Sequence, residues 1–389
     1  MASNLEQLVT AIRQVFGEGD IPLHRPVFEA NERKYVLECI DSNFVSSVGA
    51  RVTELERRLS DFTGAACGVA TVNGTAALHS ALKLVGVKRG DEVLTQALTF
   101  VATCNAIDYQ GARPVFIDVD EDTLGMSPVA LKRWLKANTL YTVHGPINRL
   151  TGARIAACLP MHTFGLPCRI TDIADICQQF AIPLVEDAAE SLGSFVNGKH
   201  TGTFGQVSTI SFNGNKIITT GGGGMILTND VELAASAKHL TTTAKVQHAW
   251  EFEHDQVGFN YRMPNLNAAL GCAQMDVLPE ILCIKAEVAE YYRVFCRSNG
   301  LKFIEPIDGA VANFWLNAVC LHDKAERDEF LQYTNERGVM TRPIWRLMSE
   351  LCPFSECQHD GLQTSRWLAD RVVNLPSSVP ESESYRLKP

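Results

Sequence analysis

The segment SFNGNKIITTGGGGMILTND, residues 211–230, places a lysine, Lys216, shortly before the four glycines of residues 221–224. A nucleotide-binding phosphate loop has its glycines before the lysine, so this order argues against one. A dinucleotide-binding glycine fingerprint opens a helix, whereas MILTND has the pattern of a strand. The glycines therefore predict a tight turn between two strands, where a positive φ or a close backbone approach is required.

Upstream of this segment, strand and helix patterns alternate from about residue 50 to residue 240. Apolar runs separated by amphipathic helices predict a mostly parallel sheet that helices cover on both faces. The expected strands include DEVLTQ (91–96), RPVFIDVD (113–120), ARIAACLPMHT (153–163) and IPLVEDAAE (182–190). Ligands of such sheets bind at the carboxyl ends of the strands. The polar residues His162, Asp187 and Glu190 stand at or just after such ends.

The pattern changes after about residue 265. A long helix is expected over residues 265–300, and the chain continues with strand-like NFWLNAVCL (313–321), helical KAERDEFLQYTNERG (324–338) and proline-containing MTRPIWRLM (340–348). We therefore predict a helical N-terminal segment (1–25), a large α/β domain (26–260) and a smaller C-terminal α+β domain (261–389).

Composition narrows the classes of function. The formal net charge of −9 argues against a general nucleic-acid binder, which needs a basic face. No segment is apolar enough for a membrane helix or a signal peptide, so a cytoplasmic protein is expected. The twelve cysteines are scattered without a CxxC spacing, and no metal site is predicted.

A second phosphate candidate is TVNGTAALHSAL (71–82), where Gly74, Thr75 and Ala76 start a helix. Free N–H groups at a helix start attract anions. The alternative interpretation is an ordinary helix cap at Asn73 or Thr75.

The candidate residues combine into a set that pyridoxal phosphate requires. Lys216 supplies the amine for a Schiff base, and Asp187 an acid for the pyridinium nitrogen. Phe100, after a predicted strand, supplies a stacking ring, and the helix start at Thr75 suits the phosphate.

Five motifs occur in the order found in one enzyme family: NGTAAL (73–78), TFVATCNAI (99–107), VEDAAES (185–191), FGQVSTISFNGNKIITTGGGG (204–224) and GFNYRMPNLNAALG (258–271). From about residue 20 to its end the chain resembles the DegT/DnrJ/EryC/StrS nucleotide-sugar aminotransferases, which are fold-type-I pyridoxal-phosphate enzymes. The resemblance implies a large domain with a mostly parallel seven-stranded sheet between helices, plus a small α+β domain.

The resemblance also implies roles for single residues. Lys216 is the Schiff-base lysine, and Asp187 matches the partner of the pyridine nitrogen. Glu190 matches a residue near the phenolic oxygen of the cofactor, and Phe100 the stacking ring. The phosphate contacts match Thr75, Ala76 and Ser211. Asn260 matches a residue that the neighbouring subunit contributes, which implies a homodimer with shared active sites.

Ordinary structural interpretations of these residues stay open. Asp187 and Glu190 could be acids favoured by a helix start, and Phe100 could belong to the core. Ser211 could satisfy a nearby backbone group, and Asn260 could be a turn residue. His162 could be a core histidine whose ring nitrogens are satisfied, rather than a substrate contact.

The implied reaction is a ping-pong transamination in which glutamate is the amino donor and Lys216 moves the proton. A lysine at position 216 favours transamination over the sugar dehydration of relatives that carry histidine there. A non-catalytic regulator with the same fold is a further alternative, although no segment resembles an added DNA-binding module.

The segments of residues 21–49 and 341–348 resemble a branch of the family that aminates C4 of nucleotide-linked 4-keto-6-deoxy sugars. That branch serves legionaminic acid, bacillosamine and related bacterial surface glycans, including lipopolysaccharide O-antigens. The expected substrate is UDP-4-keto-6-deoxy-GlcNAc, and a GDP-linked sugar of the perosamine or legionaminic type is the alternative. Arg342 and Arg346 are candidates for the diphosphate, and Phe44, Trp345 and His162 for the sugar or base.

Overall fold

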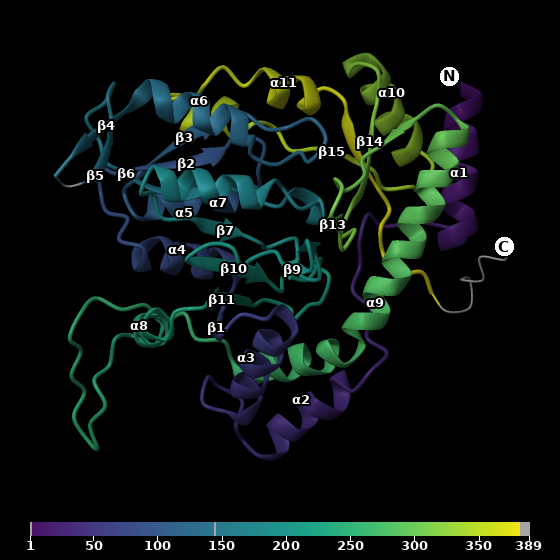
Figure 1. Ribbon diagram of the computed structural model, residues 1–389. Helices are drawn as coiled ribbons and strands as arrows, with labels where there is room; N and C mark the ends of the chain where they lie inside the picture. The colour runs from purple at the N-terminus through teal and green to yellow at the C-terminus, as the bar shows by residue number, and fades with distance from the viewer. Residues whose placement is uncertain (1, 144, 382–389) are drawn as a thin grey trace.

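A seven-stranded sheet forms the centre of the protein in this computed structural model, which describes residues 2–143 and 145–381 (Figure 1). Bridges from Cys158 to Leu184 and from Met161 to Asp187 join its three-stranded and four-stranded parts. The strands follow the order β3 (Arg113–Ile117), β2 (Glu92–Gln96), β6 (Ile155–Leu159), β7 (Val185–Asp187), β10 (Val207–Ser211), β11 (Gly224–Thr228) and β1 (Cys67–Thr71). Only β11 runs antiparallel to its neighbours in this sheet. The predicted α/β fold class is confirmed.

Helices pack on both faces of this sheet because its strands are apolar on both sides. In β2, Val93 packs with one group of helices and Leu94 with the other, as alternating strand residues must. The first group is α4 (Gly74–Leu84), α5 (Val101–Tyr109) and α8 (Val231–Thr241), and the second is α6 (Pro128–Asn138) and α7 (Ile170–Gln179). The carboxyl ends of the strands remain open for a site.

The long helix α9 (Asn265–Ser298) runs beside the sheet (Figure 1). Near its start it packs on α2 (Glu32–Asp41) and α3 (Ala50–Thr63), and near its end it shares a hydrophobic core with α1 (Ala2–Phe16). That core also includes the C-terminal antiparallel sheet, whose order is β12 (Lys302–Phe303), β14 (Asn317–Cys320), β16 (Val372–Leu375) and β15 (Arg342–Pro343). The N-terminal helix thus packs with C-terminal elements. The exact domain boundaries at residues 25 and 260 stay a prediction.

In the described ranges, the remaining elements are two small sheets, two helices and three short 3₁₀ turns. They are β4 (Thr139–Thr142), β5 (Gly145–Asn148), β8 (Phe195–Val196), β9 (Lys199–His200), β13 (Ala310–Val311), α10 (Lys324–Asn335), α11 (Gln363–Ala369) and the 3₁₀ turns Thr163–Gly165, Met348–Glu350 and Cys352–Phe354. Within the described ranges, no helix is both long and apolar enough to cross a membrane.

The glycine run lies between two paired strands, as predicted, but the connection is longer than a tight turn. Residues 212–223 join β10 to β11, and of the four glycines only Gly221 has a positive φ, of 77°. A Cβ on Gly224 would lie 2.6 Å from the carbonyl carbon of Asn73. The close approach that glycine permits at position 224 is therefore to the start of α4 in the same chain.

Candidate active site

A cavity of about 600 Å³ lies at the carboxyl ends of β7 and β10, beside the start of α4. It brings together most of the residues that the sequence singled out, although they come from five separate segments. They are Gly74, Thr75, Phe100, Asp187, Glu190, Ser211, Lys216, Arg342, Trp345 and Arg346. Four of these segments follow the carboxyl ends of parallel strands, which share one edge of the sheet. The fifth, residues 342–346, comes from the C-terminal antiparallel sheet and the chain after it.

Lys216 and Glu190 form an ion pair inside this cavity. The Nζ atom of Lys216 lies 3.1 Å from Oε1 of Glu190 and 3.9 Å from the centroid of the Trp315 ring. The other carboxylate oxygen of Glu190 accepts a hydrogen bond from the backbone N–H of Phe164 at 2.9 Å. Burial raises the pKa of Glu190 to about 7, against the opposing effect of the Lys216 charge. Glu190 can therefore exchange a proton close to neutral pH.

Asp187 ends strand β7 with a buried carboxylate that lines the cavity. Its Oδ2 accepts a hydrogen bond from the hydroxyl of Thr103 at 2.7 Å, and its Oδ1 accepts one from the backbone N–H of Ala189 at 3.2 Å. Burial raises the pKa of Asp187, while these two bonds and the charge of Lys216 lower it. An N–H cation in the cavity would favour the charged carboxylate further.

The start of α4 and the end of β10 form a cradle of small residues. A Cβ on Gly74 would lie 2.9 Å from the Cβ of Ser211, so glycine permits this close approach. Gly74, Thr75 and Ser211 line the cavity. The N–H of Ala76 instead bonds the side-chain oxygen of Asn73 at 2.7 Å. Asn73 is thus the helix cap, as the alternative interpretation expected, and Ala76 lines a smaller neighbouring hollow.

Aromatic and basic side chains form the outer wall of the cavity. The ring of Trp345 lies 6.3 Å from that of Phe100 and 4.9 Å from that of Phe164, measured between centroids. Arg342 donates to the side chain of Asn335 at 2.9 Å, and Arg346 is 70% exposed with Glu350 at 3.7 Å. These two guanidinium groups place positive charge at the mouth of the cavity.

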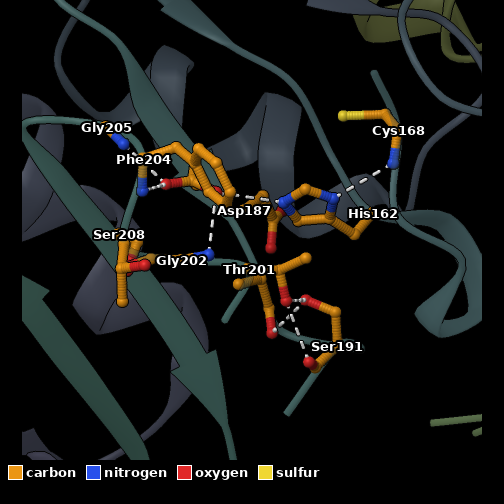
Figure 2. Close-up of polar contacts among 12 residues, drawn as sticks. His162, Cys168, Asp187, Ser191, Thr201, Gly202, Phe204, Gly205 and Ser208 are labelled. Atoms are coloured by element: carbon orange, nitrogen blue, oxygen red, sulfur yellow. Dashed lines mark hydrogen bonds and ion pairs between the residues drawn. The ribbon is translucent and has the colours of Figure 1, made fainter. Parts of the chain in front are cut away.

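His162 does not line this cavity. Its side chain is fully buried; Nε2 lies 3.2 Å from Glu186, and Nδ1 accepts a hydrogen bond from the backbone N–H of Cys168 at 3.3 Å (Figure 2). Both ring nitrogens are therefore satisfied by the protein. This is the arrangement of a core histidine, and the substrate interpretation of His162 is corrected accordingly.

Phe44 and Asn260 also lie outside the cavity of their own chain. Phe44 is 57% exposed and lines a separate hollow beside α2. Asn260 is exposed, and its side-chain oxygen accepts a hydrogen bond from Arg262 at 3.2 Å. A role for Asn260 in the site of a neighbouring subunit needs a second chain and stays a prediction.

Comparisons with known proteins agree with this geometry. The DegT/DnrJ/EryC1/StrS aminotransferase family matches residues 26–383. The chain belongs to this family. It is 34% identical to the GDP-perosamine synthase of Vibrio cholerae over 92% of this chain and 94% of the relative. It is 33% identical to the GDP-perosamine synthase of Caulobacter vibrioides, over 94% of this chain and 95% of that relative.

Among solved structures, the aminotransferase TlmJ from Streptoalloteichus hindustanus superposes with a TM-score of 0.84 at 29% identity. The match covers 92% of this chain and 94% of TlmJ. Members of the DegT family are pyridoxal-phosphate-dependent sugar aminotransferases, and this chain is one of them.

The residues present fit pyridoxal phosphate. An amine, a buried carboxylate and a glycine cradle line one cavity, and these are the kinds of group that the cofactor's aldehyde, ring nitrogen and phosphate need. In the described part of the chain, no three His, Cys, Asp or Glu side chains are grouped as metal ligands.

Sequence reasoning missed several residues of this site. Trp315 and Asn215 line the cavity next to Lys216, and Thr103 orients Asp187. Thr103 could have been found, because it lies one helical turn after Phe100. No local signal marks Trp315, which sits in a segment that reads as an ordinary apolar strand.

Proposed function

We propose that this aminotransferase moves the amino group of glutamate to C4 of a GDP-linked 4-keto-6-deoxy sugar. The observation that carries the transfer is the Lys216–Glu190 pair beside the buried Asp187 in one cavity. The GDP-perosamine synthases among the relatives support the GDP nucleotide. Exposed Arg342 and Arg346 at the cavity mouth suit a diphosphate, because a guanidinium group can bind phosphate oxygens bidentately.

UDP-4-keto-6-deoxy-GlcNAc is the second candidate substrate. It is favoured by the resemblance of residues 21–49 and 341–348 to the branch that serves legionaminic acid and bacillosamine. The two candidates share the reaction at C4 and differ in the nucleotide and in the N-acetyl group.

The residues of the candidate site have distinct roles toward the cofactor. When bound, pyridoxal phosphate supplies an aldehyde for the donor amine and an electron sink. Lys216 takes and returns the proton at the reacting carbon, and its tether beside that carbon supplies much of the rate. Glu190 holds the Lys216 ammonium. With the cofactor bound, Asp187 would hold the proton on the pyridine nitrogen, Phe100 would pack on the ring, and the Gly74–Ser211 cradle would bind the phosphate.

We also propose a homodimer with shared active sites. The segment 245–257 extends from the body of the protein beyond α8 (Figure 1), and its Trp250, Phe252 and Val257 are 77%, 80% and 80% exposed. Large apolar side chains on such a surface suit a protein partner, and two-fold dimers are the commonest assembly. Asn260 follows this segment, and the family resemblance assigns it to the active site of the neighbouring subunit.

Two experiments test these proposals. The purified enzyme is incubated with glutamate and either the GDP-linked or the UDP-linked 4-keto-6-deoxy sugar, and NMR identifies the amino sugar and its C4 stereochemistry. Lys216→Ala is the control. Faster turnover of the UDP-linked sugar would refute the GDP assignment. For the dimer, mixing inactive Lys216→Ala and Asn260→Ala subunits should restore activity, because a mixed dimer keeps one intact site. No recovery would argue against shared sites.

A further inference from the structure

We infer that the segment Asn313–Trp315, together with the buried Lys285, is the positioning element of the Lys216–Glu190 pair. It contacts both partners of the pair at once, and it fixes the position of the Lys216 ammonium whenever the amine is not bonded to the cofactor. This inference rests on the proposed aminotransferase function, to which it adds residues that the family motifs do not include.

Asn313 holds the backbone of Glu190. Its buried side-chain amide donates to the carbonyl oxygens of Glu190 at 2.8 Å and Leu192 at 2.9 Å. Its side-chain oxygen accepts a hydrogen bond from the backbone N–H of Trp315 at 2.8 Å. A single side chain therefore couples the position of Glu190 to that of Trp315.

Trp315 holds Lys216 in two ways. The face of its ring lies 3.9 Å from the Lys216 ammonium, which is a cation–π contact. Its indole N–H donates to the carbonyl oxygen of Asn215, the residue before Lys216, at 2.6 Å. His24 also contacts the Asn215 backbone, and burial together with the charges of Lys285 and Lys216 lowers its pKa.

Lys285 binds the backbone of this segment through a hydrogen bond. It is fully buried on α9 and donates to the carbonyl oxygens of Trp315, at 3.3 Å, and Ser377. Phe314, between Asn313 and Trp315, has a φ of 48°, a conformation that a bulky residue rarely adopts. Strained backbone of this kind persists where its surroundings hold it in place, and it is concentrated at functional sites.

The arrangement explains how Lys216 stays ready to act. Between its covalent engagements a lysine side chain has four rotatable bonds and would otherwise explore the cavity. The Trp315 ring and the Glu190 carboxylate both contact the ammonium and confine it within the cavity that Asp187 also lines. Trp315 is thus a positioning residue, which acts through Lys216 and not on the substrate.

The test is trace labelling of lysines with acetic anhydride at pH 7, on enzyme loaded with pyridoxamine phosphate so that Lys216 is free. Mass spectrometry compares the Lys216 peptide with Lys238, an exposed internal reference. In Trp315→Leu the Lys216 labelling should rise roughly tenfold, since a desolvated cation–π contact is lost. Trp315→Phe keeps a ring but loses the N–H bond, and should raise the labelling about threefold.

Trp367→Leu is the matched control, because Trp367 lies on α11 and does not line the cavity. Labelling of Lys216 in this variant should equal that in wild type. Equal labelling of Lys216 in wild type and in a folded Trp315→Leu variant would overturn the inference. If Trp315→Leu does not fold, Trp315→Phe decides by the same measurement. Borohydride reduction of wild-type enzyme loaded with pyridoxal phosphate separates the two proposals. If the cofactor is not trapped on Lys216, the proposed function is refuted. Lysine labelling of the protein without cofactor still tests whether Trp315 positions Lys216.

Discussion

The buried Lys285 makes the stability of the protein depend on pH in a calculable way. Burial lowers its pKa from 10.5 to about 7. This shift corresponds to a free-energy cost of ~5 kcal/mol for holding the charged form of Lys285 in the folded protein. Below pH 7 the folded protein must hold a buried charge, so its stability is reduced by the whole amount. Between pH 7 and pH 10.5 the unfolded chain binds more protons than the folded one, so stability rises with pH. From pH 6 to pH 9 this linkage amounts to about 3 kcal/mol.

Lys285→Met removes the titrating group and keeps an unbranched side chain of similar length. The carbonyl oxygens of Trp315 and Ser377 lose a donor, at a cost of about 1–3 kcal/mol each, which offsets the gain from removing the charge. The free energy of unfolding of wild type minus variant should therefore increase by about 3 kcal/mol between pH 6 and pH 9, as measured by urea titration.

Lys324→Met, at a side chain that is 64% exposed, is the control for loss of a lysine and should show no such trend. A wild-type-minus-Lys285→Met difference that stays constant within about 0.5 kcal/mol over this range would refute the reasoning.

Three further predictions concern the cavity. The reaction with glutamate should slow below about pH 7, because Glu190 takes up a proton there and releases Lys216. Glu190→Gln should remove this fall in rate from the pH–rate profile. If the variant shows the same fall, another group causes it. Asp187→Asn should weaken cofactor binding by roughly 10- to 100-fold, the value of a charge-assisted hydrogen bond, in a fluorescence titration; equal affinity would contradict its role at the ring nitrogen. Gly74→Ala should speed cofactor loss on dialysis, because its Cβ would meet Ser211 at 2.9 Å; full retention would argue against the cradle.

The order of motifs and the hydrophobic patterns were enough to predict the fold class and to single out Lys216 and Asp187, which the structure brings into one cavity. These features are local or follow chain order: buried parallel strands are apolar along their whole length, and ligand groups stand at their carboxyl ends. The strands on both sides of the glycine run were likewise predicted from their own residues.

Other features depend on segments that meet only in the folded chain. His162 could be assigned to the core only when Glu186 and the Cys168 backbone were seen to satisfy both ring nitrogens. The space around Gly224 is taken by the start of α4, which is distant in sequence. Trp315 reaches Lys216 because helix α9 and the C-terminal sheet bring residues 313–315 against the central sheet. Hydrophobic patterns report which side chains are buried, whereas packing between distant segments decides which of them touch.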